Sequence, residues 1–356
     1  MHIRRWVLTL FSVTFVLASA ASMDPVQAQK VDKNAEKAKR EEVNTVLRIV
    51  EAEAKGQPAP TDISMTFHAD FLKAQEGRTY VPFSLVMPAV PAPPKTLTMY
   101  VRVVAKAPAA PAPVDQAKTD KAKGPEYAFE DAYFVDLVPP AAGQPYRVSR
   151  AFSVPAGDYD VLIVVKERPV LGEKDKKDKN AVFKAGLMKQ ALTVPGFWNG
   201  EFATSSVLLA ENVEPLAAPL TREEAIQQPY TLGNTKITVA MSNVLPKKTE
   251  LSVVFIIYNT AQDPNKKPDV SVEYTFYQKV ATAENGEKFF NKTNPQNFNA
   301  TTLPPQFDPA LGHQLVAGQS VPLASFPEGD YRLEIKITDK LAGKSVTHNL
   351  PFKVAA

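Results

Sequence analysis

The sequence predicts an all-β protein with two antiparallel β-sandwiches in tandem, preceded by a signal peptide and a short helix. Three observations lead to this prediction. Apolar and polar residues alternate in short runs such as 97–103, which is the period of a half-buried strand. The 31 prolines and 15 glycines gather between these runs, as turn residues do. One phrase of the sequence also occurs twice, and an internal repeat of this kind indicates two copies of one domain.

The repeated phrase is a Pro-x-Gly-Asp-Tyr turn followed by an alternating strand. It runs from Pro155 to Tyr159 and returns from Pro327 to Tyr331, 172 residues later. Another pattern repeats at the same offset, because Val81-x-Phe83-x-Leu85 corresponds to Val253-x-Phe255-x-Ile257. We therefore expect a signal peptide over 1–28, a helical leader over 29–57, a first sandwich over 58–199, a linker over 200–228 and a second sandwich over 229–356.

The leader has the period of a helix rather than of a strand. Val43, Val46, Leu47 and Val50 fall at positions i, i+3, i+4 and i+7, which places them in one narrow apolar stripe. The Gly- and Pro-containing stretch 56–60 ends this helix. We expect the stripe to pack on the first sandwich, and the alternative is a helix that binds a partner.

Each sandwich is expected to hold about seven strands. In the first they cover 63–67, 80–87, 97–103, 127–137, 146–154, 159–165 and 182–194. In the second they cover 230–241, 251–258, 270–277, 288–292, 314–322, 331–338 and 345–354. Within the linker, 205–209 has the composition of a strand, and Thr221 with Glu224 forms a helix-capping pattern. The loops at 105–125 and 167–180 are rich in Ala, Pro and charged residues, so we expect them to be mobile.

The N-terminus has the layout of a secretory signal. Arg4 and Arg5 precede an apolar run over 6–20, and small residues at 18–20 or 26–28 offer two cleavage sites. An uncleaved anchor is the alternative, although the run is short for a membrane span. No other segment reaches that length, so we expect no integral membrane span after cleavage. The absence of cysteine favours a bacterial periplasmic or secreted protein over a secreted eukaryotic one.

The glycine and tyrosine of the repeated phrase predict a tyrosine corner. In Ig-like sandwiches a tyrosine near the start of a late strand bonds back to the backbone of the preceding corner. Gly157 with Tyr159, and Gly329 with Tyr331, fit this form, and we expect both glycines at positive φ. The outward neighbours after the tyrosine differ, being apolar at 162 and 164 but charged at 334 and 336. We therefore expect the strand of the first domain to be covered on both faces, by the leader helix or by the sister domain.

These pieces resemble the tandem Ig-like or fibronectin-III-like modules of uncharacterised exported bacterial proteins. The phrase 326–339, the short hairpin through Gly343 and the closing Phe352-Lys-Val354 are typical of them. The resemblance covers most of 60–199 and 229–356. It implies a β-sandwich fold and specifies no activity. The chain lacks the Cys pair and mid-strand Trp of antibody domains, so the likeness is to the cysteine-free branches.

No catalytic motif emerges from the sequence. There is no Gly-x-Ser-x-Gly elbow, no phosphate-binding loop and no His-Glu-x-x-His. We expect no metal and no cofactor. Asp158 and Asp160 suggest a calcium site, but the second copy has Arg332 at the matching place, where its charge would repel the ion. The nearest candidate for a hydrolase is Glu130-Asp131 among aromatic residues, which is more typical of a solvated strand face. Lys and Arg total 41 against 38 acids, which excludes a nucleic-acid footprint.

Phe197 and Trp198 form a candidate binding surface just after the last strand of the first domain. A tryptophan in a loop can stack on a sugar ring, and it can equally fill the junction between two domains, which we favour. The sequence therefore predicts a non-catalytic protein-binding or structural module whose partner is another envelope protein or a glycan. A carbohydrate-binding protein is the alternative, and a hydrolase is less favoured.

Overall fold

The computed structural model describes residues 33–90, 95–106, 127–141, 143–168, 183–281, 283 and 286–356. The predicted signal peptide at 1–28 and most of the predicted loops at 105–125 and 167–180 lie outside these residues. The chain is mostly strand, which confirms the all-β class. It divides into two compact units between Gly196 and Phe197. The N-terminal unit and the C-terminal unit are described separately below.

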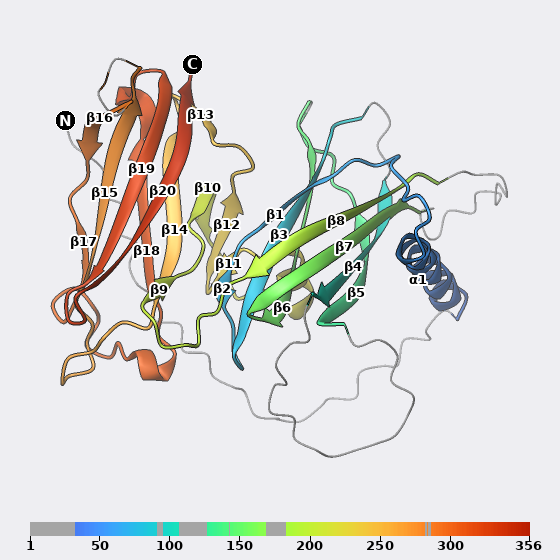
Figure 1. The fold of residues 1–356 in the computed structure, drawn as a ribbon, viewed down its shortest axis with the longest axis horizontal. Coiled ribbons are helices and arrows are strands. Elements are labelled where there is room, and N and C mark those ends of the chain that lie inside the picture. The colour runs from blue at the N-terminus through green and yellow to red at the C-terminus, as the bar shows by residue number, and fades with distance from the viewer. Residues whose placement is uncertain are drawn as a thin grey trace. The chain divides into compact units, whose positions relative to one another are not determined.

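In the N-terminal unit, two sheets enclose one hydrophobic core (Figure 1). One sheet has the order β5-β4-β7-β8, and in the other β3 pairs with β6 on one side and with β1 and β2 on the other. All of these pairs are antiparallel. The strands are β1 (Thr66–Ala69), β2 (Leu72–Lys73), β3 (Arg78–Met87), β4 (Thr96–Ala105), β5 (Phe129–Asp136), β6 (Tyr146–Pro155), β7 (Gly157–Glu167) and β8 (Ala185–Val194).

The period-two pattern explains why these segments are strands. Alternate residues of β3, such as Val81, Phe83 and Leu85, are fully buried between the sheets. They meet alternate residues of the facing strands, including Val101 and Ile163, in the same core. Burying one face of each strand in this way is the main source of stability for a sandwich without disulfides.

The C-terminal unit also packs two sheets around one core. One sheet has the order β11-β12-β10-β14-β18 with β9 paired to β14, and the other has the order β13-β20-β19-β15-β16 with β17 paired to β15. The elements are β9 (Ala203–Thr204), β10 (Leu208–Pro215), α2 (Arg222–Gln227), β11 (Thr231–Leu232), β12 (Thr235–Val239), β13 (Val244–Pro246), β14 (Glu250–Tyr258), β15 (Val270–Lys279), β16 (Glu287–Lys292), β17 (Gln296–Phe298), η1 (Pro309–Leu311), β18 (Leu315–Pro322), η2 (Leu323–Ser325), β19 (Gly329–Asp339) and β20 (Lys344–Ala355).

Two features of this unit differ from the sequence-based expectation. The range 200–228, expected as a linker, contributes β9 and β10 to a sheet, because Leu208 and Ala210 are buried in a small cluster on that sheet. The predicted cap of α2 is present there, with Thr221 and Glu224 forming a capping box. In addition, β13 runs parallel to β20, whereas only antiparallel pairs were expected. This parallel pairing is short, since it joins the three residues of β13 to the last three of β20.

The two tyrosine corners have the same geometry. The Tyr159 hydroxyl donates to the carbonyl of Pro155 at 2.9 Å, and the Tyr331 hydroxyl donates to the carbonyl of Pro327 at 2.8 Å. Both tyrosines are buried. Gly157 has a φ of 154° and Gly329 has a φ of 144°, backbone angles that residues with a Cβ rarely adopt. The corner thus ties the start of β7 or β19 to the turn before it.

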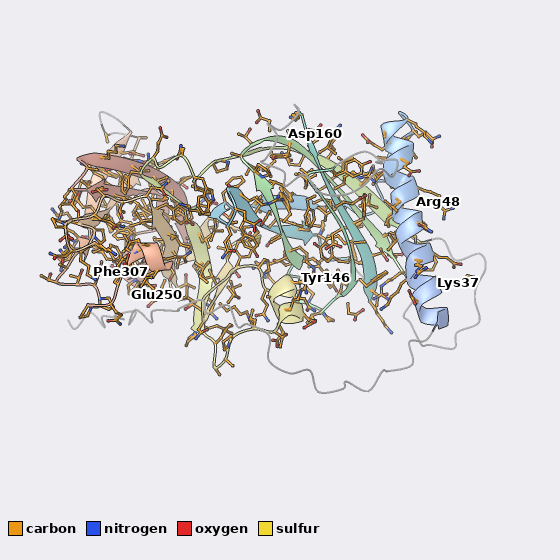
Figure 2. All side chains as sticks on the ribbon, turned by 90° about the horizontal axis from the view of Figure 1, so that it is seen from below. Lys37, Arg48, Tyr146, Asp160, Glu250 and Phe307 are labelled. Carbon is orange, nitrogen blue, oxygen red and sulfur yellow. The ribbon has the colours of Figure 1, made fainter. Side chains whose placement is uncertain are left out.

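The leader forms the single long helix of the described chain, α1 (Lys33–Ala54), and it packs on the outer face of β4 and β7 (Figure 1). Val46 and Val50 are fully buried there against Tyr100, Leu162 and Val164. The apolar stripe and its packing on the first domain are thus confirmed. At the same interface, Lys166 Nζ lies 3.0 Å from Glu42 Oε2. Figure 2 shows Lys37 and Arg48 on the side of α1 that faces away from the sheet.

The corresponding face of the C-terminal unit carries charges in place of these apolar residues. Tyr100 lies opposite Val164 in the ladder between β4 and β7. At the equivalent place between β15 and β19, Glu273 lies opposite Lys336. A helix with an apolar stripe would have to desolvate both charges to dock there. The outer face of the N-terminal unit therefore suits the apolar stripe of α1, and the corresponding face of the C-terminal unit does not.

Removing the tyrosine hydroxyl should weaken both units. We expect Tyr159→Phe and Tyr331→Phe each to lower the free energy of unfolding by about 1–3 kcal/mol, because a partly buried proline carbonyl loses its donor. Urea unfolding of each variant measures the change. Wild-type stability in both variants would contradict the role assigned to the corner.

The helix-covered face should be more sensitive to truncation than the charged face. We expect Val164→Ala to cost about 2 kcal/mol, because two methyl groups and their contacts under α1 are lost. The matched variant Lys336→Ala, at the equivalent exposed position, should change stability by less than about 0.5 kcal/mol. Thermal or urea unfolding compares the two, and equal effects would argue against the docking of α1 on this face.

Candidate functional site

The edge strands β6 and β18 occupy equivalent positions in the two units. Among the described residues, β6 pairs only with β3 and β18 pairs only with β14. Phe83 of β3 lies opposite Arg150 of β6, and Phe255 of β14, 172 residues later, lies opposite Ala317 of β18. Both edge strands end in a Val-Pro pair, at 154–155 and at 321–322. One side of each strand therefore has backbone groups without a partner strand.

The β6 edge carries two arginines. Arg147 is exposed, whereas Arg150 points into the sandwich and is 7% exposed. The Arg150 guanidinium lies 5.2 Å from the ring centre of Tyr133, and Nη1 donates to the carbonyl of Ser149 at 2.7 Å. Its Nε is buried without a hydrogen-bond partner among the described residues, and burial lowers the pKa of Arg150. An inward-pointing charge on an edge strand is one of the features that disfavour the addition of a further strand.

The β18 edge has neither arginine. Gln314 stands at the place of Arg147, and Ala317 stands at the place of Arg150. The whole strand, Leu315–Pro322, has no charged residue. Each of the other strands of six or more residues that end a sheet in the described chain, β5, β6, β8 and β16, carries a charge. So does β20, whose outer side pairs with β13 only over 353–355. The β18 edge therefore lacks the usual protection against strand addition.

The side chains of β18 are divided between the two faces of its sheet. Leu315 and Ala317 are buried in the core. On the opposite face, Val316 packs on a smaller apolar cluster and Ser320 is exposed, with its Oγ 2.7 Å from the Oγ of Ser252. The strand is thus held firmly by β14, and its outer backbone edge is a regular, rigid template.

The predicted binding residues Phe197 and Trp198 lie in a well-supported loop of the C-terminal unit. Asn259, in the left-handed conformation with φ of 56°, donates from Nδ2 to the carbonyl of Phe197 at 3.0 Å and to that of Glu201 at 2.7 Å. Within the loop, the Glu201 amide donates to Asn199 Oδ1 at 3.0 Å. The loop is therefore a rigid support for the side chain at its tip.

Phe197 and Trp198 do not share one surface. Phe197 is only 4% exposed, because its ring packs 5.1 Å from the ring centre of Tyr258, so it fixes the loop rather than binding a ligand. Trp198 is 51% exposed. The expectation that Trp198 fills the junction between the two domains stays a prediction.

The two acids proposed for a hydrolase are adjacent on β5, so their side chains leave opposite faces of the sheet. Glu130 lies outside the sandwich and accepts hydrogen bonds from Arg102, at 2.9 Å, and from Tyr100. Burial is the main cause that raises the pKa of Tyr100, and its hydrogen bond to Glu130 is the second. Asp131 lies on the inner side near Tyr133, where burial, followed by the charge of Asp131, raises the pKa of the tyrosine. Two carboxylates on opposite faces cannot flank one glycosidic bond.

The acids considered for calcium are engaged with other groups. Asp160 lies 3.4 Å from Lys106 Nζ and 3.5 Å from Lys189 Nζ, and Asp158 accepts from the hydroxyl of Thr193 at 2.6 Å. In the described ranges, no three His, Asp or Glu side chains gather as metal ligands would. Over the same ranges, no helix combines the length and apolar character needed to cross a membrane.

No protein-family model and no curated protein sequence matches this chain. Among solved structures, it is similar to a mutant of Salmonella alpha-2-macroglobulin, with 12% identity and a TM-score of 0.20 over 83% of this chain and 17% of that one. It is also similar to E. coli alpha-2-macroglobulin in its native conformation, with 12% identity and a TM-score of 0.20 over 84% of this chain and 16% of that one. This chain thus spans about a sixth of the length of both proteins.

Proposed function

We propose that this protein is an exported, non-catalytic binding module of the bacterial envelope, and that β18 receives an extended segment of a partner protein as an additional strand. The observation that supports this proposal is the open β18 edge without a charge, beside the equivalent β6 edge with Arg147 and Arg150. Strand addition draws its affinity from main-chain hydrogen bonds and its specificity from alternate side chains.

Export is part of this proposal, and the N-terminal sequence supports it. Arg4 and Arg5, the apolar run over 6–20 and the small residues that follow have the order of a secretory signal. The lack of cysteine fits a chain that folds without disulfides in a bacterial periplasm. In such a chain the free edge of β18 is available to other envelope proteins.

A charge placed on the β18 edge should abolish partner capture. We expect Ser320→Lys to lose proteins that the wild-type chain captures from an envelope extract of the source organism, because a lysine on an edge strand disfavours the addition of a further strand. The matched control is Ser153→Lys at the equivalent position of β6, which should retain them. The measurement is quantitative mass spectrometry of the captured proteins. Equal capture by both variants would refute the addition of a foreign strand at β18.

Glycan binding through Trp198 is a second candidate function. It is supported by the half-exposed ring on a loop that Asn259 holds at both ends. A planar ring on a rigid support can stack on the apolar face of a sugar. Phe197 supports the loop in this reading and does not contact the sugar.

The intrinsic fluorescence of the chain provides a direct test of this second function. The chain has two tryptophans, Trp6 and Trp198, and cleavage of the predicted signal peptide leaves only Trp198. If Trp198 stacks on a sugar, we expect its emission to shift and saturate on titration with soluble cell-wall glycan fragments. In a parallel binding assay, Trp198→Ala should lose the interaction. An unchanged spectrum at saturating glycan would exclude this function.

A further inference from the structure

We infer that the strand which adds to β18 is β18 of a second copy of this chain, so that two C-terminal units share one continuous sheet across a two-fold axis. This inference rests on the proposed function, because it names the partner of the same edge. It is carried by the composition of β18, which pairs with itself without placing any charge in the new interface.

A two-fold axis at Gly318 gives a self-consistent antiparallel register. Ala317 then lies opposite Gln319 of the second copy, and Leu315 lies opposite Val321, all on the core side of the sheet. On the other side, Val316 lies opposite Ser320 and the two glycines face each other. Because opposed residues share a face, the apolar pattern of each strand is kept. None of these cross-strand pairs carries a charge, so no repulsion between like charges destabilises the pairing.

Self-pairing of β6 in the same register is unfavourable. The residue equivalent to Gly318 is Ala151, since each lies opposite equivalent residues of the neighbouring strand, Val254 and Pro82. An axis at Ala151 makes Arg150 of one copy and Arg150 of the other diagonal neighbours across the interface, and the backbone positions of such neighbours are about 7–8 Å apart. Both guanidinium groups would be buried close to each other, and β6 itself has no carboxylate. In each copy the carboxylate whose charge acts on Arg150 is Asp131 of β5. The N-terminal unit is therefore guarded against this pairing, and the C-terminal unit is not.

The symmetry limits the assembly to a dimer. The contact is isologous, because the same strand is used by both copies and is consumed by the pairing. The other long edges of the described chain, such as β6, β8 and β16, carry charges that oppose further strand addition. We therefore expect a closed pair and no filament.

Sedimentation equilibrium of the purified chain over a concentration series tests the dimer. We expect wild-type and Ser153→Lys chains to dimerise, and Ser320→Lys chains to remain monomeric over the same range. Ser320 is exposed, so its replacement should leave folding intact, which circular dichroism and thermal unfolding verify. A wild-type chain that stays monomeric, or a Ser320→Lys chain that still dimerises, would overturn the inference.

A disulfide can test the register, because the chain has no cysteine of its own. In the proposed pairing, residue 316 of one copy is directly opposite residue 320 of the other, at a distance that a disulfide can bridge. We expect the double variant Val316→Cys with Ser320→Cys to form a covalent dimer on mild oxidation, and the single variant Ser320→Cys to remain uncrosslinked. Equal crosslinking of both would contradict the two-fold axis at Gly318.

The capture experiment separates this inference from the function on which it rests. If the wild-type chain is monomeric but Ser320→Lys still abolishes capture of other envelope proteins, the β18 edge binds a foreign strand and self-pairing is wrong. If the chain is monomeric and capture is unaffected by Ser320→Lys, both the inference and the proposed function fail.

Discussion

A β-sheet must cover its apolar face and satisfy or protect the backbone groups of its edge strands, and this double requirement shapes both units of the protein. The inner faces satisfy it in the same way in each unit, by packing against each other around one core. The outer faces and the edges differ between the units. The proposed function rests on these differences and not on the two cores, which are similar.

The N-terminal unit protects its exposed surfaces in two ways. Its outer face is apolar at Tyr100, Leu162 and Val164, and α1 covers it. Its β6 edge contains Arg150, which is buried, has a lowered pKa and has no hydrogen-bond partner for Nε within the described ranges. A buried charge of this kind is costly for stability, so its presence on an edge strand is better explained by the exclusion of other strands.

The C-terminal unit has the opposite distribution of charge. Its outer face carries Glu273 opposite Lys336, and both residues are exposed. Its β18 edge has no arginine at the two positions where β6 carries one, and the strand has no charged residue. It also differs at the corner, where η2 is inserted between β18 and Pro327, so that Phe326 is buried beside Tyr331. The two units thus both pack two sheets around a core but differ in their surfaces, and among the described residues β18 is a long edge strand without a charge.

Local patterns predicted the strands, the capped α2 helix and the leader helix, because alternation, capping residues and a 3.6-residue stripe all act over a few neighbours. The two tyrosine corners were predicted for the same reason, since the hydroxyl reaches a carbonyl only four residues away. The composition of 205–209 indicated a strand, but the incorporation of 200–228 into a sheet and the parallel β13 were not predicted, because pairing partners far along the chain decide them.

The sequence by itself predicted the all-β class, and it contains the repeated Pro-x-Gly-Asp-Tyr phrase, a signal-like N-terminus and the absence of charge at 314–322. Only the tertiary structure decided that this run is an edge strand, that Arg150 points inward and that Phe197 is buried beneath its loop. The physical reason is that exposure of an edge depends on which strands lie beside it. That neighbourhood is set by contacts between residues distant in sequence, and no local pattern encodes it.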